Sequence, residues 1–292
     1  MPPNSYISNA GRRAVQDPKA ARWLLTGVAV IFLLLFLVLP VLLVFVGALA
    51  EGVGAYLRAL RQPDALSAIW LTLAVAAVAV PLNTIFGVAA AWAIAKFQFR
   101  GKGFVVTLID LPLSVSPVIS GLVYVLLFGA RGYFGPWLAE HNVQIIFALP
   151  GIILVTLFVT VPYVARELIP LMQEQGADEE EAAVMLGASG WRTFWTITLP
   201  NIKWGLIYGV IQCNARAMGE FGAVSVVSGH IRGKTNTLPL QVEILYNEYS
   251  FTAAFAIASL LALLALLTLV IKHAVEWQAR RAYSRPQEEN VA

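Results

Sequence analysis

Two parts of the sequence combine residue types that suggest a function: polar residues 181–200, and the charged pair Arg216 and Glu220 within an apolar stretch. The polar residues place acidic side chains before a cluster of aromatic ones, which suits binding to another protein. The sequence contains neither a G-x-S-x-G nor an H-E-x-x-H pattern, and its three histidines are scattered without metal-binding spacing. We therefore expect noncovalent chemistry rather than enzymatic catalysis by this chain.

Residues 178–200 are predicted to form two short helices joined by a turn. Acidic residues open the first helix at Asp178, where they meet the positive end of the helix dipole. Gly187 suits the left-handed conformation that ends a helix, and Ser189 is a suitable N-cap for the next one. Pro200 is expected to close the second helix, because the residue before a proline is pushed out of the helical region.

The second of these helices is expected to present an aromatic face. Trp191, Phe194 and Trp195 lie at positions i, i+3 and i+4, which share one side of a helix. Rigid aromatic anchors rimmed by charge are typical of binding hot spots. The alternative is an amphipathic hairpin on the lipid headgroups, with its tryptophans in the interfacial belt. That alternative does not explain the spacing of the whole stretch.

These residues are expected to be positioned by membrane-spanning helices. The chain of 292 residues is 59% hydrophobic and 13% charged, which is more apolar than a globular domain. Several apolar runs approach the ~20 residues that cross a bilayer, and none alternates like a barrel strand. We predict an all-α polytopic membrane protein with six transmembrane helices, at residues 23–50, 66–95, 104–128, 143–164, 204–227 and 251–271.

Lysine and arginine residues predict the orientation of these helices, because they are enriched on the cytoplasmic side. Most lie in the N-terminal tail, including Arg12 and Arg13, in loops after the second and fourth helices, and in the C-terminal tail, including Arg285. Both termini and residues 181–200 are therefore expected to be cytoplasmic. The first apolar run is too long for a signal peptide and is expected to stay attached as a helix.

The chain is predicted to have three parts. Residues 1–65 comprise the cytoplasmic N-terminal tail, the first helix and the first periplasmic connection. Residues 66–276 form a five-helix core with a cytoplasmic loop at residues 176–200, and residues 277–292 form a cytoplasmic tail. The net charge of +3 is small and does not indicate nucleic-acid binding, and the single cysteine, Cys213, excludes an internal disulfide.

The third predicted helix is interrupted by prolines and by Ser114, Ser116 and Ser120. Irregular polar backbone at membrane depth is tolerated only inside protein or beside a water-filled path. Residues 111–121 therefore either line a translocation path or belong to a helix that starts late, after a loop at the membrane interface. Asp110, just before them, is expected to have a structural role.

Arg216 and Glu220 are four residues apart and can pair on one helix face. A lone arginine at the bilayer centre costs about 2.5–3.5 kcal/mol or more, so the pair is expected to face protein or water. Arg216 either attracts a passing anion, with Glu220 preventing a trap, or forms a structural ion pair that sets the helix register. Both interpretations stay open on the sequence.

Two other features also leave alternatives. Gly205 and Gly209 allow close helix approach, either at a subunit interface or within the chain. The basic residues His230, Arg232 and Lys234 form either a solvated loop or a contact with a receptor or an emerging anion.

The pattern E-A-A, three residues, G, nine residues, I-x-L-P is filled by Glu181, Ala182, Ala183, Gly187, Ile197, Leu199 and Pro200. In this pattern the chain resembles the integral permease subunits of bacterial ABC importers, which have the MetI-like, type I fold. The resemblance covers roughly residues 66–271. It implies that residues 181–200, with Trp191 and Phe194, form a coupling helix seated in a groove of the ATP-binding subunit.

Residues 215–223, A-R-A-M-G-E-F-G-A, resemble a segment of permeases for tetrahedral oxyanions. The following V-S-V-V-S-G and T-L-P-L favour the sulfate and thiosulfate permeases among them. The resemblance implies an ATP-driven importer, with Ser114, Ser116, Ser120, Arg216 and Glu220 as candidates for its translocation path. A permease for molybdate or another oxyanion is the alternative within the class.

The resemblance also implies partners and a location. These are two copies of an ATP-binding subunit, a second homologous permease subunit and a periplasmic sulfate/thiosulfate-binding protein, in a bacterial inner membrane. The chain itself is expected to bind no cofactor, while ATP and Mg would be used by the ATPase. A self-contained secondary transporter is a rival of another class, for which inverted repeats and a coupling-ion site are expected but not clearly seen. A structural membrane scaffold without transport is a third.

Overall fold

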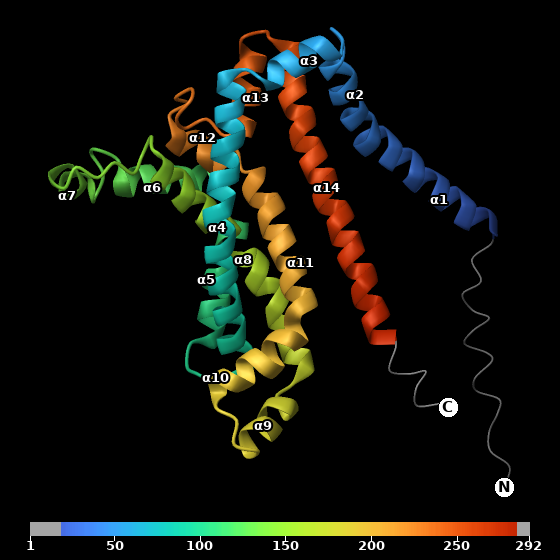
Figure 1. Cartoon of the computed structure of the whole chain (residues 1–292), viewed down its shortest axis with the longest axis vertical. Helices are drawn as coiled ribbons and strands as arrows, with labels where there is room; N and C mark the ends of the chain where they lie inside the picture. The colour runs from blue at the N-terminus through green and yellow to red at the C-terminus, as the bar shows by residue number, and fades with distance from the viewer. Residues whose placement is uncertain (1–18, 285–292) are drawn as a thin grey trace.

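The computed structural model describes residues 19–284, which form helices joined by short loops (Figure 1). Arg12, Arg13 and Arg285, used above to predict orientation, lie outside the described residues. The helices are α1 (Lys19–Leu33), α2 (Leu39–Ala48), α3 (Val53–Leu60), α4 (Pro63–Lys96), α5 (Lys102–Ser114), α6 (Pro117–Phe128), α7 (Gly135–Glu140), α8 (Leu149–Gln175), α9 (Asp178–Met185), α10 (Gly190–Thr193), α11 (Leu199–Met218), α12 (Gly222–Ser228), α13 (Leu238–Asn247) and α14 (Phe251–Ser284).

The elongated body of the molecule consists of α4, α8, α11 and α14 (Figure 1). Its core includes Val164 and Leu168 of α8 and Ile202 of α11, all fully buried. A Cβ added to Gly209 would lie 3.2 Å from Cα of Val164, and one added to Gly205 would lie 2.5 Å from Cδ2 of Leu171. These two glycines therefore serve close packing of α11 on α8 within the chain.

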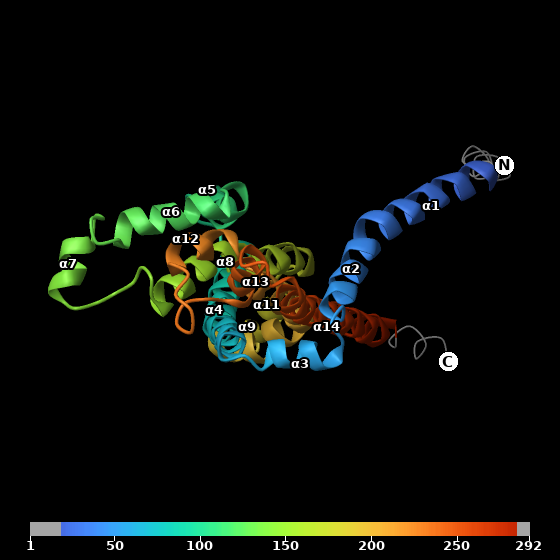
Figure 2. The same ribbon diagram turned by 90° about the horizontal axis from the view of Figure 1, so that it is seen from above.

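Two parts project from this body (Figure 2). The α1–α2 segment extends away on one side, and no residue in its most apolar stretch of 18 residues is buried. The α6–α7 arm extends on the other side. Its root is held by α12, because Gly121 brings α6 so close that an added Cβ would lie 2.7 Å from the backbone oxygen of Ala223. A hairpin of α9 and α10 occupies one end of the body, and α3 and α13 occupy the opposite end (Figure 1).

Four continuous segments in the described part of the chain are long and apolar enough to cross a membrane: Ala21–Ala48, Pro63–Lys96, Leu149–Gln175 and Phe251–Gln278. A fifth would be the pair α5 and α6, which is bent by 106°. The all-α, multi-span prediction is confirmed, whereas the count of six helices and the cytoplasmic placement of both termini stay predictions.

Two predicted spans need correction, and the predicted interruption of the third is confirmed. In the third, Val115 is extended and Pro117 starts a new helix in a different direction. The fourth begins at Leu149 rather than residue 143, since the backbone N–H of Phe147 donates to Val227 (2.8 Å) instead of a helical carbonyl. It also continues to Gln175. The fifth is broken after Met218, where α11 ends; three residues separate it from the start of α12 at Gly222.

Two prolines are accommodated by wide helical turns instead of ending a helix. A π-helical turn, Leu34–Val38, precedes Pro40, and another, Phe194–Thr198, precedes Pro200. Proline lacks an N–H and its ring crowds the carbonyl four residues back, so a locally widened helix relieves both problems. The prediction that Pro200 closes the second short helix was therefore wrong: α10 continues through the π-helical turn into α11.

Candidate functional site

The α9–α10 hairpin has the local geometry predicted for it. The backbone N–H of Ala188 donates to Ala183 (3.0 Å) and that of Gly187 to Val184 (2.9 Å), which is the Schellman motif that ends a helix. Gly187 has a φ of +90°, a conformation that a side chain would strain. The Ser189 hydroxyl accepts from the backbone N–H of Arg192 (3.4 Å), so the predicted N-cap is confirmed.

The aromatic face of the hairpin differs from the prediction at one position. Trp191 is 68% exposed and Trp195 is also exposed, but Phe194 is buried. Its ring packs against Trp92 of α4 at an interplanar angle of 45°, with 5.0 Å between ring centroids. Phe194 therefore anchors the hairpin to the body and is not itself available to a partner.

The most exposed apolar residues of the hairpin were missed from the sequence. Met185 and Leu186, at the end of α9, are 88% and 89% exposed. Together with Val184, Trp191 and Trp195 they form the hairpin tip, an apolar surface at the end of the molecule. Such a surface on a projecting element typically marks a protein interaction site. The sequence signal for them was the run V-M-L just before Gly187. From the sequence, these three residues predict only that the helix continues.

The remaining residues of the predicted pattern surround this tip. Glu181, Ala182 and Pro200 are exposed, whereas Ala183, Ile197 and Leu199 are half-buried. The structure thus brings the pattern together on one compact element, with Ala183, Ile197 and Leu199 partly covered and the apolar spacers Val184, Met185 and Leu186 exposed.

Arg216 and Glu220 form the predicted ion pair, with 2.5 Å between Nη1 and Oε2. Glu220 lies beyond the end of α11, so its carboxylate can reach the next helix as well as Arg216. Its Oε1 accepts from the backbone N–H of Ala223 (2.8 Å) in the first turn of α12. Glu220 is 2% exposed, while the Arg216 side chain is 29% exposed. Glu220 therefore joins α11 to α12, and Arg216 keeps part of its charge accessible.

The three candidate serines lie around the bend between α5 and α6, but they are not equivalent. Ser114 and Ser116 are exposed at the bend. Ser120 is buried and donates to the backbone oxygen of Ser116 (3.2 Å), so it stabilises the first turn of α6. Nearby, Asp110 pairs with Arg166 of α8 across 3.5 Å, which agrees with a structural role that links α5 to α8.

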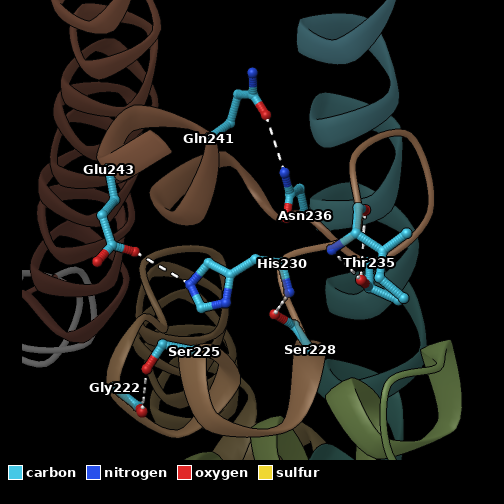
Figure 3. A network of polar contacts seen from close by, with 9 residues as sticks. Gly222, Ser225, Ser228, His230, Thr235, Asn236, Gln241 and Glu243 are labelled. Atoms are coloured by element: carbon cyan, nitrogen blue, oxygen red, sulfur yellow. Dashed lines mark hydrogen bonds and ion pairs between the residues drawn. The ribbon is translucent and has the colours of Figure 1, made fainter. Parts of the chain in front are cut away.

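The basic loop between α12 and α13 is tied to its surroundings (Figure 3). His230 Nε2 lies 3.3 Å from Glu243, and its backbone N–H donates to Ser228 (3.1 Å). Arg232 pairs with Glu248 and lies 3.7 Å from Asp64. In the same loop the buried Asn236 donates to Gln241 (3.2 Å). Two of the three basic residues are thus engaged within the chain.

The helical body, its candidate spans and the projecting hairpin define the membrane subunit of an ABC importer. The chain belongs to the family of binding-protein-dependent transport system inner membrane components, whose model matches residues 83–282. With its apolar helices, this makes it a multi-pass membrane protein.

Individual relatives agree with this family. The chain is 49% identical to the sulfate transport system permease protein CysW of Escherichia coli K12 over 92% of each chain. It is 32% identical to the sulfate transport system permease protein CysT of the same strain, over 83% of this chain and 88% of the relative. The crystal structure of a bacterial ABC transporter involved in alginate import superposes with a TM-score of 0.72, covering 90% of this chain and 96% of that one. At 17% identity, the last similarity concerns the fold alone.

Proposed function

We propose that this chain is the transmembrane permease subunit of an ATP-driven importer for sulfate or thiosulfate. The observation that carries the transport role is the exposed apolar tip of the α9–α10 hairpin, which gives a soluble motor a surface to bind. The cargo is proposed from the sulfate transport relatives, which match nearly the whole chain.

In this proposal the hairpin lies on the cytoplasmic side of a bacterial inner membrane, and both termini share that side. Six spans are reached by counting α5–α6 and α11–α12 as broken spans. The partners are two copies of an ATPase, a second homologous permease and a periplasmic anion-binding protein. The permease chain itself performs no catalysis and binds no cofactor, whereas ATP and Mg act on the ATPase.

The mechanism follows from the connection between the hairpin and the body. Closure of the ATPase around nucleotide pushes the hairpins of the two permeases together and turns the helices outward-facing. The binding protein then releases its anion into the cavity between the permeases. Hydrolysis of ATP resets the helices and lets the anion leave on the cytoplasmic side.

The direct test is uptake by proteoliposomes that contain the chain, the second permease and the ATPase, with the binding protein and labelled sulfate outside. We expect uptake that requires ATP and all four components. Competition by unlabelled sulfate and thiosulfate but not by molybdate would support the cargo assignment. Uptake by the purified chain alone would instead support a secondary transporter, and preferential uptake of molybdate would reassign the cargo.

Arg216 is proposed to attract the anion as it passes. Replacing it with glutamine is expected to reduce sulfate uptake at low substrate about tenfold or more, because a charge-assisted hydrogen bond contributes about 1.5–3 kcal/mol. Arg216→Lys should retain part of the activity. The measurement is initial uptake in proteoliposomes with matched amounts of assembled complex. Arg232→Gln is the control, since Arg232 is engaged with Asp64 and Glu248. Unchanged uptake in Arg216→Gln would leave the arginine with a structural role only.

A further inference from the structure

The base of the hairpin is organised around Lys96, the last residue of α4. Its Nζ lies 3.1 Å from Oε2 of Glu180 in α9, and it also donates to the backbone oxygen of Gly176, the residue that ends α8. The side chains of Lys96 and Glu180 are only 10% and 17% exposed. This lysine therefore joins three helices at the point where the body meets the hairpin.

Glu180 extends the connection to α11. Its other carboxylate oxygen, Oε1, accepts from the hydroxyl of Thr198 (2.7 Å), which is buried in the π-helical turn leading into α11. The adjacent Glu179 accepts from Asn201 Nδ2 (2.6 Å). One carboxylate thus contacts the end of α4 and the start of α11, and we call the contact of Lys96, Glu180 and Thr198 the clasp.

The clasp matters because α9 has little else to hold it. None of the residues of α9 is buried. Its far end is set by the Schellman motif at Gly187, which is local to the hairpin. On the α10 side the hairpin is anchored by Phe194 against Trp92, and Trp92 lies one helical turn before Lys96 on α4. The polar clasp and this aromatic contact therefore both connect the hairpin to the same end of α4.

An ion pair that is largely shielded from solvent and supported by extra hydrogen bonds resists displacement more than a surface pair does. A force that moves α9 must therefore either move α4 with it or break the clasp. Lys96 at 10% exposure is not available to pair with lipid headgroups, which is the ordinary role of a basic residue at the end of a membrane helix.

We propose that Lys96 is a positioning residue for energy coupling: through Glu180 it makes α4 move with α9, so that displacement of the hairpin by the ATPase reaches the transmembrane body. This inference rests on the proposed function. In this proposal the movement of the hairpin reaches the body first through the clasp, and not through the contact of Phe194 with Trp92 alone.

The test measures how many sulfate ions are imported per ATP hydrolysed by the complete complex in proteoliposomes. In Lys96→Met this ratio is expected to fall at least about fivefold, the lower range of typical coupling between sites. Glu180→Gln keeps an acceptor for Thr198 and should show the same loss through the missing charge. Lys96→Glu combined with Glu180→Lys should recover part of the ratio. The matched control is Lys203→Met. Lys203 and Lys96 both line a cavity of about 390 Å³ at the base of the hairpin, but Lys203 lies over the Trp204 ring and is not part of the clasp.

A fall in assembled complex without a change in the ratio would show a structural role only and would overturn the proposal. A second readout does not depend on the cargo. Spin labels on Leu186→Cys and Leu82→Cys, in a Cys213→Ser background, report the distance between the hairpin tip and α4. We expect a narrow distribution that broadens in Lys96→Met, and an unchanged distribution would contradict the proposal. If the wild-type complex imports no sulfate, the proposed function fails and the distance measurement still decides the role of the clasp.

Discussion

Replacing Trp191 with alanine is expected to uncouple ATP hydrolysis from import while leaving insertion of the chain intact. Trp191 is the more exposed of the two tryptophans of the hairpin tip, and truncation of a hot-spot tryptophan typically costs about 2 kcal/mol or more of binding free energy. ATPase binding should therefore weaken roughly thirtyfold, and uptake should fall with it. The measurements are ATPase retention during purification of the complex and sulfate uptake in proteoliposomes.

The matched control for this variant is Trp70→Ala. Trp70 is 73% exposed but lies near the start of α4, whose opposite end, at Lys96, meets the hairpin. Its loss should leave ATPase retention unchanged. A substitution at Gly187 should uncouple the complex as well, because a side chain would be strained at its φ of +90° and would shift the tip. Wild-type transport in both hairpin variants would count against the coupling role.

Replacing Glu220 with alanine is expected to destabilise the assembled chain more than any other single change at the charged pair. The substitution leaves the Arg216 guanidinium and the Ala223 N–H without their carboxylate partner, at a cost of about 3 kcal/mol or more. Thermal unfolding of the detergent-solubilised chain should show a clearly lower Tm. Glu220→Gln keeps an acceptor for Ala223 and should be less harmful.

The control for Glu220 is Glu243→Ala. Glu243 also pairs with a basic residue, His230, but both side chains are about 40% exposed, and such pairs contribute about 0–1 kcal/mol. Its removal should change the Tm little. Equal Tm values for Glu220→Ala and the wild type would show that the connection between α11 and α12 does not depend on this carboxylate.

The hairpin was predictable because its determinants are local. The acidic start at Asp178, the left-handed Gly187 and the N-cap Ser189 each act within a few residues, so the sequence contains the whole argument for two helices and a turn. The orientation of Phe194 was not predictable in this way. It depends on Trp92, which is about a hundred residues away in the chain and packs beside it only in the folded body.

The breaks within the predicted spans were only partly predictable. The prolines and serines of residues 111–121 marked the interruption between α5 and α6, but not its 106° angle, since α6 also packs against α12. The end of α11 at Met218 depends on Glu220, whose side chain satisfies an N–H of the next helix instead of continuing the first. Periodicity predicts that a segment is helical, whereas long-range contacts decide where its direction changes.

Lys96 shows the same limit for a charged residue. On the sequence it is one of several basic residues that indicate the cytoplasmic side. In the structure its partners are Gly176 and Glu180, about eighty residues further along. The rule that predicts the cytoplasmic side from basic residues does not predict these partners.

The central claim is that the hairpin tip binds the ATPase, and cross-linking from Leu186 tests it most directly. A photoreactive amino acid at Leu186, which is 89% exposed, should form a covalent adduct with the ATPase in membranes that contain the complete complex. The same photoreactive group at Tyr133, which is 83% exposed in the α6–α7 arm, should form no adduct with the ATPase. Cross-linking of the ATPase from Tyr133 but not from Leu186 would contradict the account.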